Sequence, residues 1–208
     1  MSSGIEPSGL TQTIPTTLLQ AVNQMLKAIG RAEVMSLKPE NMTEDAQSAL
    51  SMVSDTSVEV QSRGWHFNED EAFPIDPDTE GYINLPANAA SVTINPKSFP
   101  MDVTWRGARL YDKAAHSFVF SKTVYVDLKL LFEFEELPQP IRWYVMALSG
   151  RKYGVGRLPE SATFRFTTAV EEDALSRALQ YDQDSRRAIL PETSPHFASF
   201  RRGQRRII

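Results

Sequence analysis

The sequence predicts an α+β fold: an antiparallel bundle of four helices, an inserted antiparallel β-sheet region and an extended C-terminal tail. Apolar residues recur at helical spacing before residue 64 and again after residue 137. Between these segments the apolar period falls to two, and β-branched and aromatic residues alternate with polar ones. The 208 residues, 41% of them hydrophobic, are enough for one sizeable domain or for a compact core with an inserted subdomain.

These patterns divide the chain into successive segments. We expect a flexible leader over residues 1–14, because this stretch is rich in Ser, Thr, Gly and Pro. Residues 15–64 and 137–188 form the helical bundle, and residues 65–136 form the inserted β region. Residues 189–208 form the extended basic tail. The helices on either side of the insertion most simply pack together.

Two helices are predicted before the β region. The first begins after a cap at Thr16 or Thr17, ends at Gly30, and buries one face, formed by Leu18, Leu19, Val22, Met25, Leu26 and Ile29. The second begins at Thr43 and ends at Gly64. Its buried stripe is narrow and contains small residues, so a neighbouring helix can approach closely: Ala46, Ala49, Leu50, Val53 and Val60.

The β region is predicted to start directly after Gly64, because Trp65, His66 and Phe67 alternate as in a strand. Further strands lie in the segments 103–112 and 116–134, and residues 111–117 (YDKAAHS) connect two strands of a hairpin. A polar turn at residues 76–81 precedes a short strand. Several prolines indicate that the first strands are short, interrupted or at an edge: Pro74, Pro77, Pro86, Pro96 and Pro100.

Two helices follow the β region. Pro138 and Pro140 suit the first turn of one helix, whose buried face contains Ile141, Tyr144, Val145 and Leu148. The last helix is expected over roughly residues 162–188. Its apolar side contains Phe166, Val170, Ala174, Ala178 and Tyr181.

Composition excludes several classes of protein. A net charge of −4 and a pI near 5.5 are not those of a chain built as a whole to neutralise nucleic-acid phosphates. The absence of cysteine excludes disulfides, cysteine-based zinc sites and thiol catalysis. Without a signal sequence or an apolar run of about 18–20 residues, we expect a soluble protein made in the cytoplasm.

No catalytic or metal-binding pattern is found, so we expect neither an enzyme nor a cofactor. His66, His116 and His196 fall in separate segments. Residues 76–81 (DPDTEG) match the start of a calcium loop, but position 12 is Ala87, which favours a polar turn. The Gly-x-Gly in residues 153–158 lacks the other residues of a phosphate loop, and there is no Gly-x-Ser-x-Gly sequence.

Two segments are candidates for a specific role. In the tail, apolar and aromatic residues are interleaved with arginines: Phe197, Phe200, Arg201, Arg202, Arg205, Arg206, Ile207 and Ile208. This pattern suits a solvated terminus, a segment that orders on an acidic groove of a partner protein, or a nucleic-acid-binding segment.

The second segment is the helix-to-strand elbow formed by Arg63, Gly64, Trp65 and Phe67. There Gly64 allows the change of direction, Trp65 and Phe67 hold the sheet against the bundle, and Arg63 bonds the exposed carbonyls at the helix end.

The order of several motifs resembles the tail tubular protein A family of short-tailed bacteriophages. The motifs are AVNQMLKAIG (residues 21–30), QSRGWHFN (61–68), EGYINLP (80–86), VTWRGARLYD (103–112) and FEELPQPIRWYV (134–145). QSRGWHFN is the most specific of them, and the resemblance extends from about Ala21 to Tyr181. The fold it implies, a helical bundle with an inserted β region, agrees with the periodicity.

The resemblance implies a structural protein of the virion tail, made in the host cytoplasm. Family members form a ring, typically of twelve subunits, between the portal protein and the tail nozzle, tail tubular protein B. The ring helps to attach the tail fibres, and DNA passes through its lumen without sequence-specific binding. In related connectors a C-terminal extension reaches the portal, so residues 197–208 are expected to dock there. An alternative is a nucleic-acid-binding accessory protein that acts in packaging or ejection through the arginine-rich tail.

Overall fold

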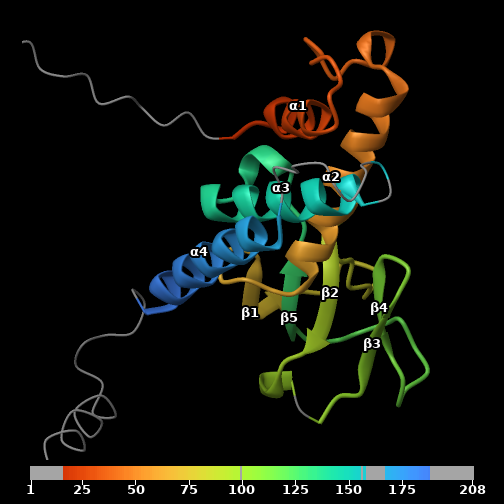
Figure 1. Ribbon diagram of the computed structural model, residues 1–208. Helices are drawn as coiled ribbons and strands as arrows, with labels where there is room; N and C mark the ends of the chain where they lie inside the picture. Colours follow the sequence, from red (N-terminus) through yellow and green to blue (C-terminus); the bar gives the residue numbers. More distant parts are fainter. Residues whose placement is uncertain (1–15, 99, 156, 158–166, 188–208) are drawn as a thin grey trace, which may run out of the picture.

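The computed structural model describes residues 16–98, 100–155, 157 and 167–187 and shows a mixed α+β fold (Figure 1). The four α-helices are α1 (Leu18–Ala28), α2 (Glu44–Ser62), α3 (Gln139–Gly154) and α4 (Thr168–Arg187). The five strands are β1 (Glu69–Ile75), β2 (Ala89–Ile94), β3 (Val103–Arg106), β4 (Arg109–Asp112) and β5 (Val124–Leu130). Three short 3-10 helices complete the described elements: η1 (Pro39–Asn41), η2 (Pro96–Ser98) and η3 (Phe134–Glu136). The predicted class and the four helices are confirmed.

The helix starts follow from local capping. Thr17 accepts a hydrogen bond from Gln20 N at 3.2 Å, while the Gln20 side chain accepts one from Thr17 N, which forms a capping box. Thr43 caps α2 by accepting from Ala46 N at 3.2 Å. The start of the last helix differs from the prediction: α4 begins at Thr168, not near residue 162, because Thr167 is non-helical and caps it. Phe166 lies outside the described residues.

Helix α3 is central to the helical part. It packs against α1, α2 and α4, and α1 also packs against α2. Their shared core includes Val22 and Met25 of α1, Val53 of α2, and Tyr144 of α3. Helix α4 contributes small residues, Ala174 and Ala178, which bring it close to α3. Within the described residues, no helix combines the length and apolar character that a membrane span needs.

The β region contains two antiparallel sheets. One has the strand order β1-β5-β2, so the last strand in sequence is the central one, and the other is the β3–β4 hairpin. The register of β1 shifts between Asp70 and Phe73, where Ala72 has a φ of 53°. Its N–H donates to the Asp127 carboxylate of β5 at 2.8 Å. This bulge bends the edge strand and leaves the pairing with β5 intact on both sides.

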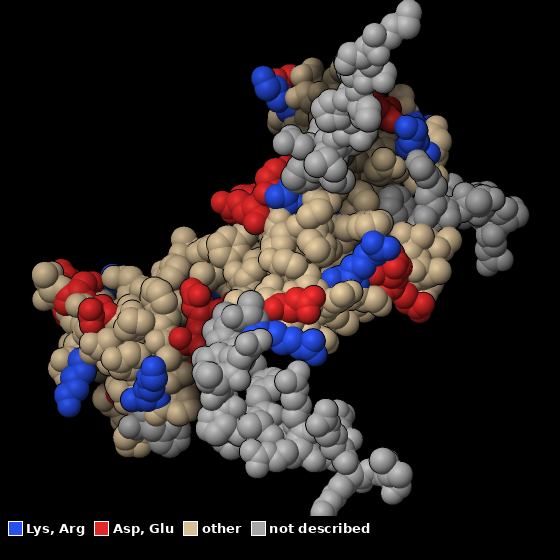
Figure 2. All heavy atoms as spheres, turned by 90° about the vertical axis from the view of Figure 1, so that its left-hand side faces the viewer, with Lys and Arg blue, Asp and Glu red and all other residues tan. Residues whose placement is uncertain are grey.

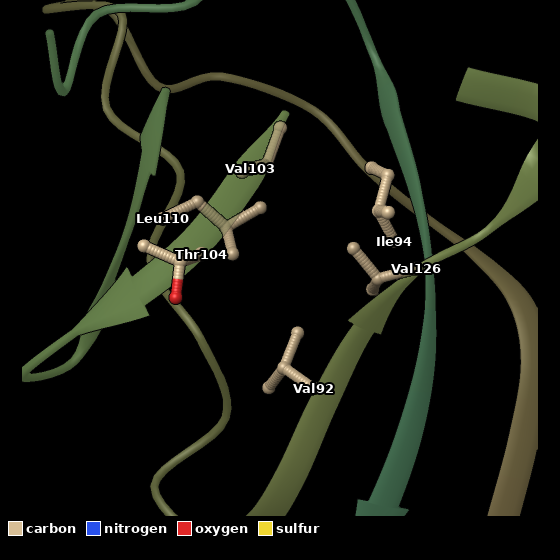
Figure 3. A pocket seen from close by; sticks show the side chains of 6 residues that line it. All are labelled: Val92, Ile94, Val103, Thr104, Leu110 and Val126. Carbon is tan, nitrogen blue, oxygen red and sulfur yellow. The ribbon is translucent and has the colours of Figure 1, made fainter. Parts of the chain in front are cut away.

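A second apolar core lies between the sheet and the hairpin. Alternate residues of β2 and β5 face the hairpin, and Leu110 of β4 is buried against them. Figure 3 shows Val103 and Leu110 on the hairpin side of a cavity and Val92, Ile94 and Val126 on the sheet side. The cavity measures about 10 Å³, room for at most a single water molecule, so the two layers are closely packed.

The prediction that a strand begins at Trp65 is wrong. Residues 65–68 form a turn, closed by a hydrogen bond from Asn68 N to Trp65 O at 3.0 Å, and β1 begins at Glu69. Trp65 and Phe67 both pack on the helical core. Their spacing of two therefore reflects a turn whose side chains return to one core, and not the alternation of a strand.

Candidate functional site

The junction between α2 and β1 (residues 61–68) joins the two cores, and Gly64 is its pivot. Gly64 has a φ of +83°, a conformation that residues with a side chain rarely adopt, and its N–H bonds to Gln61 O at 3.0 Å. A Cβ atom at Gly64 would lie 2.2 Å from Glu69 Oε1 and 2.8 Å from Lys129 Cε. The backbone conformation therefore favours glycine, and a Cβ atom would in addition displace the ends of the Glu69 and Lys129 side chains.

Trp65 anchors the turn in the helical core. Its side chain is 3% exposed, its Nε1 donates to Val60 O at 2.7 Å, and its backbone N–H donates to Asn68 Oδ1 at 2.8 Å. The indole meets the Tyr144 ring edge to face, with 6.4 Å between centroids. Trp65 thus buries a large apolar surface while both of its N–H groups have partners.

Two buried amide side chains connect α2 to the far end of β5. Asn68 Nδ2 donates to Gln61 O at 3.0 Å and to Leu130 O at 2.8 Å. Gln61 bonds both backbone groups of Phe132, with Nε2 donating to its carbonyl at 3.0 Å and Oε1 accepting its N–H at 2.8 Å. The two amides thus tie α2 to the end of β5 and to the residues just beyond it.

Sequence analysis assigned no role to Gln61 and Asn68, although they are the first and last residues of QSRGWHFN. The signal that could have found them is a polar amide at each end of a segment that changes direction, because the backbone there lacks helix or ladder partners.

Arg63 takes a different partner from the one expected. Its Nη1 donates to Tyr144 OH at 2.8 Å, and its guanidinium lies 5.6 Å from the centroid of the same ring. The carbonyl of Arg63 instead accepts a hydrogen bond from Lys129 Nζ at 3.2 Å. Phe67 contacts Phe132 with 6.1 Å between ring centroids, beside the Gln61 contacts.

The end of α4 is fixed to the same junction. Asp182 accepts the backbone N–H of His66 at 2.6 Å, and Arg186 pairs with both Asp182 and Glu69 at 2.9 Å. These bonds, first to Asp182 and then to Glu69, raise the pKa of the Arg186 guanidinium. Helices α2 and α4 and strand β1 thus meet at the junction.

The outward face of the β3–β4 hairpin carries arginines stacked on aromatic rings. Arg106 lies 3.7 Å from the Tyr111 ring centroid, and Arg109 lies 4.3 Å from that of Tyr82. Phe118 meets Tyr111 edge to face at 4.9 Å between centroids. We call these residues the hairpin face: Tyr82, Arg106, Arg109, Tyr111 and Phe118.

The three-stranded sheet has a polar surface opposite the hairpin. An open hollow of about 390 Å³ lies there, lined by side chains of β1, β2 and β5. We call it the acidic sheet face, after the carboxylates of Glu69, Glu71 and Asp127. Asp70 also borders the hollow, but it pairs with the buried Leu128 and so lies on the hairpin side of the sheet. Lys129 is the one basic residue of the lining.

Within the turn at residues 76–81, the Asp78 side chain accepts hydrogen bonds from neighbouring residues. Asp78 Oδ1 accepts the backbone N–H of Tyr82 at 2.8 Å and that of Glu80 at 3.0 Å, and Oδ2 accepts from Asn84. The bond from Tyr82 is the main cause that lowers the pKa of Asp78. In the part of the chain that the structure describes, no three His, Asp or Glu side chains are grouped to hold a metal ion.

The candidate tail residues cannot be placed against these surfaces. Phe197, Phe200, Arg201, Arg202, Arg205, Arg206, Ile207 and Ile208 all lie outside the described residues. The face seen from the left of Figure 1 shows basic and acidic side chains side by side among uncharged surface (Figure 2). The described residues visible on that face form no continuous basic surface of the kind that binds a nucleic-acid backbone.

A family model described as "Tail tubular protein" matches residues 19–190, which include the four described helices, except for the first residue of α1, and both sheets. The chain belongs to this family. The expected resemblance to tail tubular protein A is thereby confirmed, and the protein is a structural component of a bacteriophage tail.

A curated relative is tail tubular protein A of Klebsiella phage KP34. It is 28% identical to this chain over 127 residues, which are 61% of the chain and 66% of the relative. The chain thus matches just under two thirds of that protein's length.

Proposed function

We propose that the protein is the adaptor of a phage tail, a ring that joins the portal protein to the tail nozzle. The observation that carries the proposal is the match of residues 19–190 to the tail tubular protein family, together with the relative named tail tubular protein A. In this proposal about twelve copies, made in the host cytoplasm, close into a ring. The ring meets tail tubular protein B below, helps to attach the tail fibres, and lets DNA pass through its lumen.

The junction supports this role mechanically. A ring subunit that lies between two partners must transmit force without separating into its parts. The buried contacts of Trp65, Gln61 and Asn68 tie the helical core to β5, and the ion pairs of Arg186 add α4 to the same point. The helical part and the sheet are therefore expected to move as one body.

The basic tail is proposed to dock on the portal. Arginines and aromatic residues provide much of the binding energy at protein interfaces, and residues 197–208 contain both. The nucleic-acid-binding alternative relies on the same segment. It predicts a salt-dependent affinity for DNA that is lost when the last eight residues are removed.

Native mass spectrometry and electron microscopy test the proposal. The full chain is measured alone and mixed with the portal protein of the same phage. We expect a ring stacked coaxially on the portal, and weaker stacking after deletion of residues 195–208. A chain that neither forms rings nor binds the portal contradicts the adaptor role. Unchanged portal binding by the deletion variant contradicts only the role of the tail.

A further inference from the structure

We propose that neighbouring copies of the chain bind head to tail, with the hairpin face of one copy seated on the acidic sheet face of the next. This inference rests on the proposed ring, because a closed ring is built from contacts between two different surfaces of the same chain. Both surfaces are formed by residues that the structure describes.

The hairpin face has the composition of an interface centre. Arginine, tyrosine and other aromatic residues dominate binding energy at protein interfaces. Here two arginines are already held in place by the rings of Tyr111 and Tyr82, so binding would cost little side-chain entropy. Phe118 is 37% exposed, and Val119, which pairs with Tyr82 in a β-bridge, is 56% exposed. This much exposed apolar surface at one end of the molecule marks a docking surface.

The acidic sheet face complements it in charge. Glu69 is already paired with Arg186 and Lys129, and Asp127 is held by Ala72 N and by the amide of Asn95 at 2.6 Å. Asp70 and Glu71 are exposed and form no ion pair with any residue that the structure describes. Asp70 pairs with Leu128 in the register and so lies on the hairpin side of the sheet, whereas Glu71 lies in the bulge opposite Asp127, on the side of the hollow. Glu71 is therefore available to Arg106 or Arg109 of a neighbouring copy, at the rim of a hollow large enough for side chains.

The two surfaces lie on opposite sides of the β region. In β2 and β5, Val92, Ile94 and Val126 face the hairpin, whereas the intervening Thr93 and Asp127 line the hollow. Within the hairpin, Leu110 faces the sheet, so its neighbours Arg109 and Tyr111 point away from it. Figure 1 shows the hairpin beside the sheet, on the far side from β1. Surfaces on opposite sides of a subunit suit repeated addition in one direction around a ring.

Pairing of exposed strand edges is a less suitable contact. The β1 edge is bent by the bulge at Ala72 and contains Pro74, which has no N–H to donate. Side-chain docking through the hairpin face does not need that edge.

Cysteine cross-linking tests the contact, because the natural chain contains no cysteine. Thr93→Cys places a thiol in the hollow, and Ala108→Cys places one in the exposed turn between β3 and β4. Phage particles that carry the double variant are purified and treated with a short bismaleimide, and the products are separated by denaturing electrophoresis. We expect a ladder of covalent multimers from the double variant and monomers from each single variant. The matched control joins Ala108→Cys with Glu40→Cys, an exposed site in η1, and should stay monomeric.

The possible results separate this inference from the proposed function. Particles that contain the protein in rings, but yield only monomers from the double variant, overturn the head-to-tail contact and leave the adaptor role intact. Covalent dimers from either single variant also overturn it, because they indicate a symmetric contact between identical surfaces. A protein that is absent from the tail, or present without rings, overturns the proposed function and this inference with it.

Discussion

An arginine lies over a tyrosine ring both at the helix-to-sheet junction and on the β3–β4 hairpin, in opposite surroundings. At the junction Tyr144 is 1% exposed, and Arg63 also donates to its hydroxyl. On the hairpin Arg106 and its neighbour Phe118 are exposed, and the ring of Tyr111 is covered only in part. Similar residues thus serve the fold in one place and are available to a partner in the other.

The comparison shows that residue type alone does not separate a structural cluster from a docking surface. What separates them is the number of backbone groups that depend on the cluster. Junction side chains satisfy the carbonyls of Val60, Gln61, Leu130 and Phe132. Among the described residues, Arg106 and Arg109 of the hairpin face bond no backbone group, and Arg109 donates to the Asn84 side chain at 3.2 Å. Substitutions should therefore reduce stability at the junction and association at the hairpin.

Replacement of a tryptophan by alanine should show the largest difference between the two regions. Trp65→Ala removes a buried indole and its bond to Val60 O, and should lower the free energy of unfolding by about 3–5 kcal/mol. Trp105→Ala, the matched change on the hairpin, should cost about 1 kcal/mol or less, because that side chain is already 41% exposed. Urea denaturation followed by circular dichroism measures both. Equal losses would contradict the distinction.

The buried amide should show the next largest effect. Asn68→Ala removes the side-chain partner of the Leu130 carbonyl and of the Trp65 backbone N–H, which should cost about 2–3 kcal/mol. Asn88→Ala is the control, because Asn88 also donates to a carbonyl, that of Leu131, but is exposed. Water can take the place of its side chain, so the loss of stability should be only about 0.5–1 kcal/mol. If the two variants unfold at the same urea concentration, Asn68 is not a structural link.

Alanine substitutions at Gly64 and Gly30 distinguish the cost of backbone strain from the cost of steric contact. Gly64→Ala forces a side chain into a positive φ and displaces Glu69 from its ion pairs, with an expected loss of about 1–2 kcal/mol. Gly30→Ala has a similar φ of +73° but meets nothing within 4 Å, so it should lose only the backbone part, about 1 kcal/mol. A loss at Gly30 as large as at Gly64 would show that the approach of β1 contributes nothing.

The sequence predicts the class of the fold because each element has a local cause. The helical stripes, the threonine caps and the glycine at the end of α2 are short-range signals, and they lie where the structure has them. Two features were missed because their cause is not local. Trp65 and Phe67 alternate as strand residues do, but both are drawn to the helical core, and Gln61 acts on Phe132, 71 residues away. A contact of that separation leaves no periodic pattern in a sequence.

Neither candidate surface was predicted, for a similar reason. Arg106 and Arg109 belong to one predicted segment and Tyr82 to another, and only the strand register and the ring contacts place them on one face. The same holds for the acidic sheet face, where Asp127 joins residues of β1. The arginine-rich tail was a candidate because its pattern is contiguous, and sequence reading detects contiguous or periodic patterns but not contacts between distant segments.

Charge reversal on the hairpin should have the smallest effect on folding. Arg106→Glu changes an exposed side chain, so the free energy of unfolding should change by no more than about 0.5 kcal/mol. Arg106→Glu combined with Arg109→Glu should nevertheless abolish the cross-linked ladder, because the new acidic residues would then face Glu71 of the next copy. Lys38→Glu, an exposed change before η1, is the control and should leave the ladder unchanged.

The decisive step is to restore the ladder. Glu71→Arg places a basic side chain at the acidic sheet face, and alone it should also weaken association, with stability again little changed. The chain that carries all three reversals presents an acidic hairpin to a basic residue at the rim of the hollow and should regain the ladder, since the charges of the contact have been exchanged. General damage to the fold would be cumulative and could not be reversed by one further substitution. A triple variant that folds but does not cross-link would therefore refute the pairing of these two surfaces, whatever the reversals on each surface alone had shown.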